Sequence, residues 1–106
     1  MKHESVAELL PDHLRSPSLS IENAIVGSRS TQTRFSTPHK ADVLEWWNSG
    51  MPQNLVPVLT EPNDEFTDYY CVNLGEGSPV VVFCDHAIVN CWDSIDAFVA
   101  WLKDQL

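Results

Sequence analysis

Basic residues are missing from most of this chain. Its 106 residues include six Lys or Arg against fifteen Asp or Glu, which gives a formal net charge of −9. Between Lys40 and Lys103 there is no Lys or Arg, whereas there are ten Asp or Glu. Nucleic-acid binding depends on basic side chains that neutralise phosphates, so this charge excludes nucleic acid as a partner. It favours a basic protein partner, because opposite surface charges speed association.

Cysteine is scarce, and the chain has no long apolar run. The three cysteines, Cys71, Cys84 and Cys91, form no C-x-x-C pair, and the first residues hold no apolar signal segment. An odd, sparse set of thiols without such a segment is typical of a reducing compartment. We therefore expect a cytoplasmic protein. Apolar runs such as Val80 to Cys84 are far too short to span a membrane, so no membrane association is expected.

Length and composition fit one globular domain. Domains typically have about 100–150 residues, and a chain of this size buries about 65% of its unfolded surface. The hydrophobic content of 43% and the charged content of 20% are ordinary for a folded protein. We therefore expect a single domain over residues 1–106 that forms its core without disulfides.

The first third of the chain is rich in Ser, Thr and Pro. A short helix is expected from Ser5 to Leu14, interrupted by Pro11, which lacks the backbone N–H that a helix interior uses. Ser20 to Val26 has the composition of a strand bounded by Gly27. Ser28 to Ser36, with five Ser or Thr and two Arg, is typical of an exposed loop.

A helix is expected to follow this segment. Thr37 is a good N-cap and Pro38 fits the first helical position, while Gly50 and Pro52 end the helix. Trp46 lies one position away from the apolar stripe and is expected to be partly exposed. The side chains expected to face the core are Val43, Leu44 and Trp47.

Short apolar segments separated by turn residues predict an antiparallel meander. The expected strands are Leu55 to Leu59, Thr67 to Leu74, Pro79 to Cys84 and Ile88 to Trp92. The turns between them are Glu61 to Glu65, Gly75 to Ser78 and Asp85-His86. Pro57 demotes the first strand to a sheet edge or a bulge, because proline cannot donate to the strand ladder. The second strand alternates, with Tyr70 and Val72 on one face and Tyr69 and Cys71 on the other.

The chain ends in an amphipathic helix. Asp93 or Ser94 caps it, and Asp96 lies near its positive end. Its apolar residues recur at three- and four-residue spacing, with Trp101 beside them: Ile95, Phe98, Val99, Leu102 and Leu106. Burying each such side chain contributes about 1.5–3 kcal/mol. We therefore expect an α+β fold in which this and other helices pack against one antiparallel sheet.

Two segments of the chain carry a family resemblance. They are NLVPVLTEPNDEFTDYYCVNL and SPVVVFCDHAIVNCWDSIDAFVAWL. In this order, over residues 55–102, they resemble the SUKH superfamily, which includes fungal cell-wall-synthesis regulators of the Smi/Knr type and many bacterial immunity proteins. Residues 1–36 diverge from the family pattern. Leu10-Pro11 corresponds to the Leu-Pro step of the family, but no Asn-Gly turn follows, since Asn23 has no glycine after it.

The resemblance implies an α+β fold without catalytic activity or a cofactor. It implies that the chain acts by binding, and in bacteria such domains commonly neutralise a cognate toxin, often a nuclease. A nuclease attracts phosphate with basic residues, so an acidic inhibitor can occupy the same surface. The alternative is a regulatory or scaffold module without a toxin partner, like the fungal members.

Acidic loop residues are the candidate contacts for such a partner. Asp64, Glu65 and Asp68 are close together in the sequence, and Glu76 adds to them if both loops lie at the same end of the sheet. Trp46 is a further candidate, because interfaces are enriched in Trp. An unpaired sheet edge also allows self-association, so we expect a monomer or a weak homodimer.

Thiol chemistry is the remaining alternative. Cys71, Cys84, His86 and Cys91 are of the types that bind zinc, but they lack the paired C-x-x-C spacing, and free cysteines usually act as small buried hydrophobes. Cys84 with His86 or His39 is a conceivable nucleophile pair. A reactive thiolate needs electropositive surroundings, which this acidic segment does not supply. Asp85-His86 is better interpreted as a structural turn.

Overall fold

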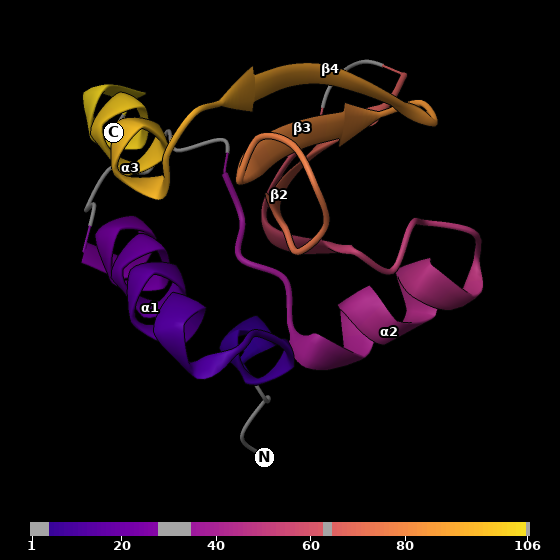
Figure 1. The fold of residues 1–106 in the computed structure, drawn as a ribbon, viewed down its shortest axis with the longest axis horizontal. Helices are drawn as coiled ribbons and strands as arrows, with labels where there is room; N and C mark the ends of the chain where they lie inside the picture. Colours follow the sequence, from indigo (N-terminus) through magenta and orange to yellow (C-terminus); the bar gives the residue numbers. More distant parts are fainter. Residues whose placement is uncertain (1–4, 28–34, 63–64, 106) are drawn as a thin grey trace.

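One four-stranded antiparallel sheet organises the protein (Figure 1). The computed structural model describes residues 5–27, 35–62 and 65–105. Their elements in chain order are η1 (Val6–Leu9), α1 (Asp12–Gly27), α2 (Lys40–Asn48), β1 (Leu55–Pro62), β2 (Thr67–Asn73), β3 (Val80–Cys84), β4 (Ala87–Trp92) and α3 (Ile95–Gln105). The strand order is β1-β2-β3-β4, and each strand pairs antiparallel with the next. The predicted α+β fold with a meander sheet is confirmed.

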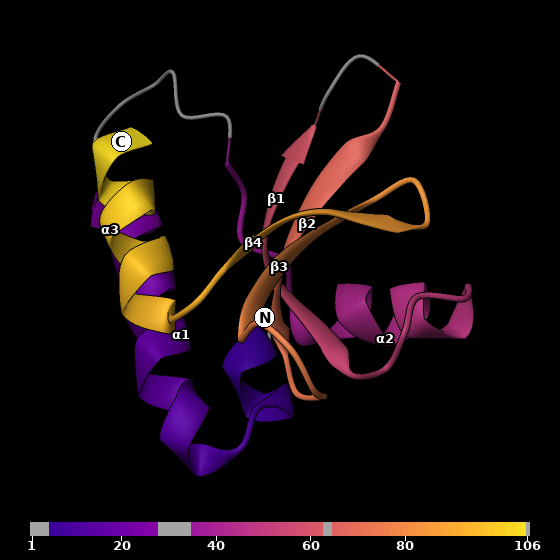
Figure 2. The ribbon, with the colours of Figure 1, turned by 45° about the horizontal axis from the view of Figure 1, so that its top comes forward.

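Helices α1 and α3 lie side by side on one side of the strands, and α2 lies apart from them (Figure 2). Helix α2 is tied to the start of β1, with Val43 buried in the main core and Trp46 packed against Tyr69. The face that carries Tyr70, Val72 and Val82 belongs to the main core and is called the core face below. The opposite face, which carries Tyr69, Cys71, Val81 and Phe83, is called the outer face. None of the described helices combines the length and the apolar character needed to cross a bilayer.

An aromatic cluster fixes α3 to the core face. The ring of Tyr70 lies 5.6 Å from the rings of Phe35 and Trp101 and 5.9 Å from that of Phe98. Trp92 at the end of β4 lies 4.9 Å from Phe98. Aromatic pairs in such geometry contribute about 0.5–1.5 kcal/mol each beyond the area that they bury. The cluster therefore joins the sheet, α3 and the segment before α2 into one core.

Helix α3 begins and packs as the sequence predicts. The hydroxyl of Ser94 accepts a hydrogen bond of 3.0 Å from the backbone N–H of Ala97, which is the N-cap interaction. Phe98 and Leu102 are fully buried in the core. Leu106, the last residue of the predicted stripe, lies outside the described residues.

The predicted strand at Ser20 to Val26 is wrong, because this segment belongs to α1. Ile21 and Ile25 are four residues apart and therefore lie on the same side of a helix. Both pack into the main core, and Ile21 is 1% exposed. Strand propensity depends strongly on context, and burial of an amphipathic face stabilises the helix more than propensity opposes it.

The predicted helix from Ser5 to Leu14 is also wrong, because Pro11 divides it more completely than expected. Over the described residues 5–10, the helical structure is the single 3₁₀ turn η1, and α1 begins at Asp12, directly after Pro11. Leu10 is extended at φ −103° and ψ 149°, which is the conformation that a following proline favours. The hydroxyl of Ser5 accepts a hydrogen bond from Ala7 N–H and caps the turn.

Helix α2 begins later than predicted. Its N-cap is His39, not Thr37, and the backbone N–H of His39 donates to the Asp42 carboxylate at 2.9 Å. Ser36 and Thr60 exchange two backbone hydrogen bonds of 2.9 and 2.8 Å. This pairing keeps the chain extended before the helix. Of the predicted loop Ser28 to Ser36, residues 28–34 lie outside the described residues, and Phe35 is buried, contrary to an exposed loop.

The remaining predictions for this region have mixed outcomes. Val43 is fully buried and Trp47 packs against the core as expected, whereas Leu44 is 45% exposed, contrary to prediction. A helix of nine residues turns only a narrow stripe to the core. Gly50, at φ +115°, ends the helical segment as predicted. Pro57 lies in an edge strand with a register irregularity between Pro57 and Leu59, which also confirms the prediction.

Candidate functional site

The outer face of the sheet has surface hollows beside α2. Three hollows meet there, and all three are lined by Phe83 and His86. We call them together the outer groove. The aromatic hollow, of about 150 Å³, is lined by Trp46, Ser49, Gly50, Met51 and Tyr69 in addition. The loop hollow, of about 400 Å³, adds Glu65, Phe66, Thr67, Tyr69 and Asp85. The edge hollow, of about 430 Å³, adds Pro52, Asn54, Leu55, Asn73, Glu76 and Ile88.

The β3–β4 hairpin places His86 at the groove. Cys84 pairs with Ala87, so the hairpin has a two-residue loop of Asp85 and His86. Both loop residues have positive φ, 48° and 63°, which is the pattern of a type I′ turn. Asp and His tolerate this region better than most residues with a Cβ atom. The predicted structural turn is therefore confirmed, and its His86 side chain also lines all three hollows.

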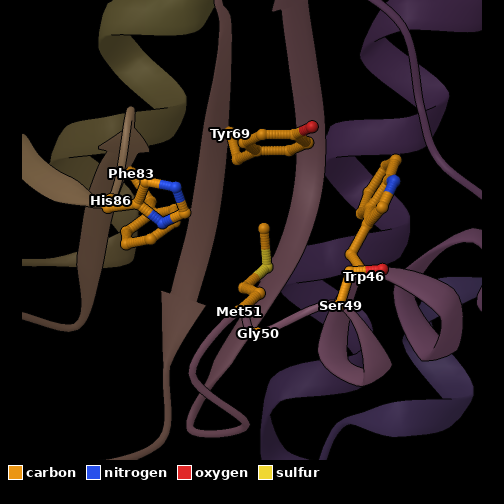
Figure 3. Close-up of a pocket in the computed structure, with 7 residues that line it drawn as sticks. All are labelled: Trp46, Ser49, Gly50, Met51, Tyr69, Phe83 and His86. Carbon is orange, nitrogen blue, oxygen red and sulfur yellow. The ribbon is translucent and has the colours of Figure 1, made fainter.

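Helix α2 and the loop after it form one wall of the aromatic hollow. The indole N–H of Trp47 donates a hydrogen bond of 2.8 Å to the carbonyl of Leu55, which ties α2 to the start of β1. Trp46 packs against Tyr69 with ring centroids 4.9 Å apart and an interplanar angle of 63°. Tyr69 and Met51 lie between Trp46 on one side and Phe83 with His86 on the other (Figure 3).

The structure separates the predicted acidic contact residues. Glu65 lines the loop hollow beside Asp85, while Glu76 lines the edge hollow. In an antiparallel meander, the β1–β2 loop and the β2–β3 turn lie at opposite ends of β2, so the two predicted loops do not meet at one sheet end. Asp68 comes directly before Tyr69 in β2, and successive side chains of a strand point to opposite faces. Asp68 therefore lies on the core side of the sheet. Asp64 lies outside the described residues.

The sheet also separates the thiols. Cys71 and Cys91 both pair with Val81, so they share the outer face, whereas Cys84 lies on the opposite side. Among the described residues, no three His, Cys, Asp or Glu side chains come together in a way that could hold a metal ion. The side chains considered for zinc in the sequence therefore do not form one site in this structure.

The surroundings of Cys71 and Cys84 favour the neutral form of both thiols. A hydrogen bond to the Asp68 carboxylate raises the pKa of the Cys84 thiol, and burial and the charges of Asp68 and Asp85 act in the same direction. Burial raises the pKa of Cys71 far above its ordinary value. A nucleophilic cysteine needs the opposite shift. His86 lines the outer groove together with Phe83. Cys84 follows Phe83 in β3 and therefore lies on the opposite face of the sheet from Phe83.

The apolar strand residues that line the groove are not predicted as a site from the sequence. Of the predicted contact residues, Trp46, Glu65 and Glu76 line the groove, whereas the sequence predicts Tyr69, Phe83 and Ile88 only as strand residues. A signal for them is present in the sequence. The run from Val80 to Cys84 is apolar at every position, so β3 presents apolar side chains to both faces of the sheet. Cys71 and Val81 of the outer face are buried, whereas Tyr69 and Phe83 are only partly buried and remain available for contacts.

Comparison with known proteins gives no assignment for the chain. No family model, no curated protein and no solved structure matches it.

Proposed function

We propose that this chain is a cytoplasmic binding protein without enzymatic activity, which docks a basic protein in the outer groove. The observation that carries the proposal is an apolar, aromatic surface surrounded by carboxylates. The groove residues all fall between positions 46 and 88, where the sequence has no Lys or Arg. Interface centres are typically aromatic, and charged rims guide the encounter with a partner of opposite sign.

The exposed apolar side chains support binding at this face. Ile88 is 58% exposed and Phe66 is 46% exposed, and both line hollows of the groove. Contiguous apolar surface of this kind, bordered by polar residues, typically marks interaction sites. Glu65, Asp85 and Glu76 supply the border of the groove. A basic partner gains from both features at once.

Neutralisation of a toxin is the form of this function that we propose. The resemblance of residues 55–102 to the SUKH superfamily motivates it, and the acidic groove supports it. A nuclease toxin must expose basic residues to hold phosphate, and an acidic protein that covers them blocks its substrate. The mechanism is occlusion, in which carboxylates speed the encounter and the aromatic floor determines the lifetime of the complex.

Charge reversal at the groove tests the proposal. Protein with Glu65→Lys and Glu76→Lys is compared with wild type as bait in a lysate of the source cell, and the captured basic protein is then titrated in purified form. We expect association to slow about tenfold and its dependence on salt to weaken, since opposite rim charges mainly affect association rates. The purified partner, if a toxin, is then assayed for inhibition by each protein.

A matched control separates this effect from a change in total charge. Glu8→Lys with Asp104→Lys changes the net charge by the same amount, and both residues are exposed and line none of the three hollows. This control is expected to bind like wild type. Capture of no basic protein, or equal effects of the two double variants, contradicts docking in the outer groove.

A further inference from the structure

We infer that the aromatic hollow formed by Trp46, Met51, Tyr69 and Phe83 is a binding site for one cationic side chain, an arginine or a lysine of the partner. This inference rests on the proposed function, because it names the residue type that anchors the basic protein. The volume of about 150 Å³ is below the range of about 300–1,000 Å³ that is typical of small-molecule sites. The hollow therefore suits the end of a single side chain.

The chemistry of the walls favours a cation. Three aromatic side chains come from three different elements, Trp46 from α2, Tyr69 from β2 and Phe83 from β3. The face of an aromatic ring attracts a cation through its quadrupole, and Trp attracts it most strongly of the three. Arg also stacks on aromatic faces through its planar guanidinium group. A neutral apolar side chain would gain burial alone.

The charge around the hollow favours a cation further. Glu65 and Asp85 line the adjoining loop hollow, which shares Tyr69, Phe83 and His86 with the aromatic hollow. No Lys or Arg occurs anywhere in the sequence between positions 41 and 102, so none from this segment competes for the rings. A cation bound to the rings would therefore have two carboxylates in the adjoining hollow. An anion would be repelled, and a neutral group would gain nothing from them.

Backbone and side-chain hydrogen bonds hold the walls in place before any partner arrives. The carbonyl of Trp46 accepts hydrogen bonds from the backbone N–H groups of Ser49 and Met51, both at 3.1 Å. The positive φ of Gly50 allows this tight turn, which brings Met51 back beneath the hollow. Together with the Trp47 bond to β1, these contacts reduce the ordering cost of binding.

A pair of peptides tests the inference without the natural partner. The probe is Ac-Gly-Gly-Arg-Gly-Gly-amide, and the control replaces Arg by citrulline, which has the same shape but no charge. Binding is followed through the NMR signals of the Trp46 indole and the Tyr69 and Phe83 rings at constant ionic strength. We expect saturating shifts for the Arg peptide with a dissociation constant of about 1–50 mM, and binding of the citrulline peptide that is at least about fivefold weaker.

Variants assign the preference to the rings. Trp46→Leu and, independently, Tyr69→Leu keep an apolar side chain but remove a ring, and each is expected to abolish the preference for Arg. Leu44→Ala, on an exposed position of the same helix that lines none of the three hollows, is expected to retain it. Thermal unfolding of each variant verifies that it is folded. Because two independent ring variants are made, the test remains possible if one of them misfolds.

The outcomes separate this inference from the proposed function. Equal binding of the Arg and citrulline peptides, shifts confined to other residues, or an unchanged preference in both ring variants overturns the cation site. If the cation site is overturned while the Glu65→Lys/Glu76→Lys protein still loses its partner, the partner docks in the groove through another anchor. If the Arg peptide binds as expected but no basic protein is captured, the cation site holds and the proposed function fails.

Discussion

The hydroxyl of Tyr70 donates a hydrogen bond of 2.7 Å to the carboxylate of Glu61 on the neighbouring strand. Tyr70 is 5% exposed, and its ring packs against Phe35 and Trp101 in the aromatic cluster. The side chain is therefore fixed at its polar end by β1 and along its ring by the core. This single residue connects the β1–β2 pairing with the attachment of α3.

Removal of this hydroxyl should destabilise the protein measurably. Tyr70→Phe keeps the ring and is expected to lower the free energy of unfolding by about 1.5 kcal/mol, because hydrogen bonds to charged groups contribute about 1.5–3 kcal/mol. The matched control is Tyr69→Phe on the outer face, which should change it by less than about 0.5 kcal/mol. Urea denaturation measures both, and equal effects of the two changes would refute the role assigned to the Tyr70 hydroxyl.

The N-cap of α3 gives a second prediction. Ser94→Ala removes the acceptor of the Ala97 N–H and should cost about 1 kcal/mol. For a domain of this size, that loss lowers the melting temperature by about 4–8 °C. Ser94→Asp retains an acceptor at the cap and should remain near the wild-type melting temperature. A melting temperature of Ser94→Ala equal to that of wild type would show that Ser94 does not cap the helix.

The Asp85-His86 turn gives a prediction of opposite sign. His86 adopts φ +63°, where a residue with a Cβ atom is disfavoured by about 1–2 kcal/mol. Glycine removes this cost but loses about 0.5–1 kcal/mol to the larger entropy of the unfolded chain. His86→Gly should therefore stabilise the protein by about 0.5–1 kcal/mol in urea denaturation. His86→Ala is the control, since alanine keeps the Cβ atom, and stabilisation by alanine as well would contradict a backbone cause.

The buried thiol of Cys71 should make the protein less stable at alkaline pH. Burial raises the pKa of Cys71 in the folded protein above its value in the unfolded chain. The folded state therefore holds a proton that the unfolded state releases, so stability is fully present below the unfolded pKa of about 8.5 and falls as the pH rises above it. The slope for one such thiol is about 1.4 kcal/mol per pH unit.

Denaturation at several pH values and thiol labelling measure this effect. Cys71→Val should lose the part of the alkaline slope that Cys71 contributes. In the folded wild type, a thiol reagent should react first with the exposed Cys91 and last with the buried Cys71, which reacts only through unfolding. Rapid labelling of Cys71 under native conditions would mean that it is not buried.

The second half of the fold was predictable because its signals are local. Turn residues such as Gly75 and Gly77, the alternation in β2, and the Ser94 cap each act within a few residues, so they identify the strands and α3 from the sequence. In the first third, Pro11 marks a local boundary, but no local signal decides the structure of the segment after it. Whether Ile21 and Ile25 lie on a strand or a helix depends on the sheet against which they pack, and that information is not in the segment itself.

The candidate site was predictable only in part for the same reason. The charge of Glu65 and Glu76 can be read from the sequence, but their places relative to each other depend on which end of the sheet each turn occupies. The association of Trp46 with Tyr69 and Phe83 depends on the angle at which α2 meets the strands. Such long-range placement is determined by packing, and the residue types alone do not specify it.

Tyr69 and Tyr70 are neighbours in the sequence but lie on opposite faces of the sheet, so they have different structural roles. Tyr70 belongs to the aromatic cluster, whereas Tyr69 forms a wall of the aromatic hollow. Substitutions at outer-face positions can therefore change the lining of the outer groove while the cluster keeps the protein folded. Insertion of one residue within β2 has a different consequence, because it exchanges the two faces for the rest of the strand. The lining of the outer groove can therefore change by substitution, whereas a single-residue insertion in β2 has to be absorbed by a bulge, like the irregularity of β1 between Pro57 and Leu59.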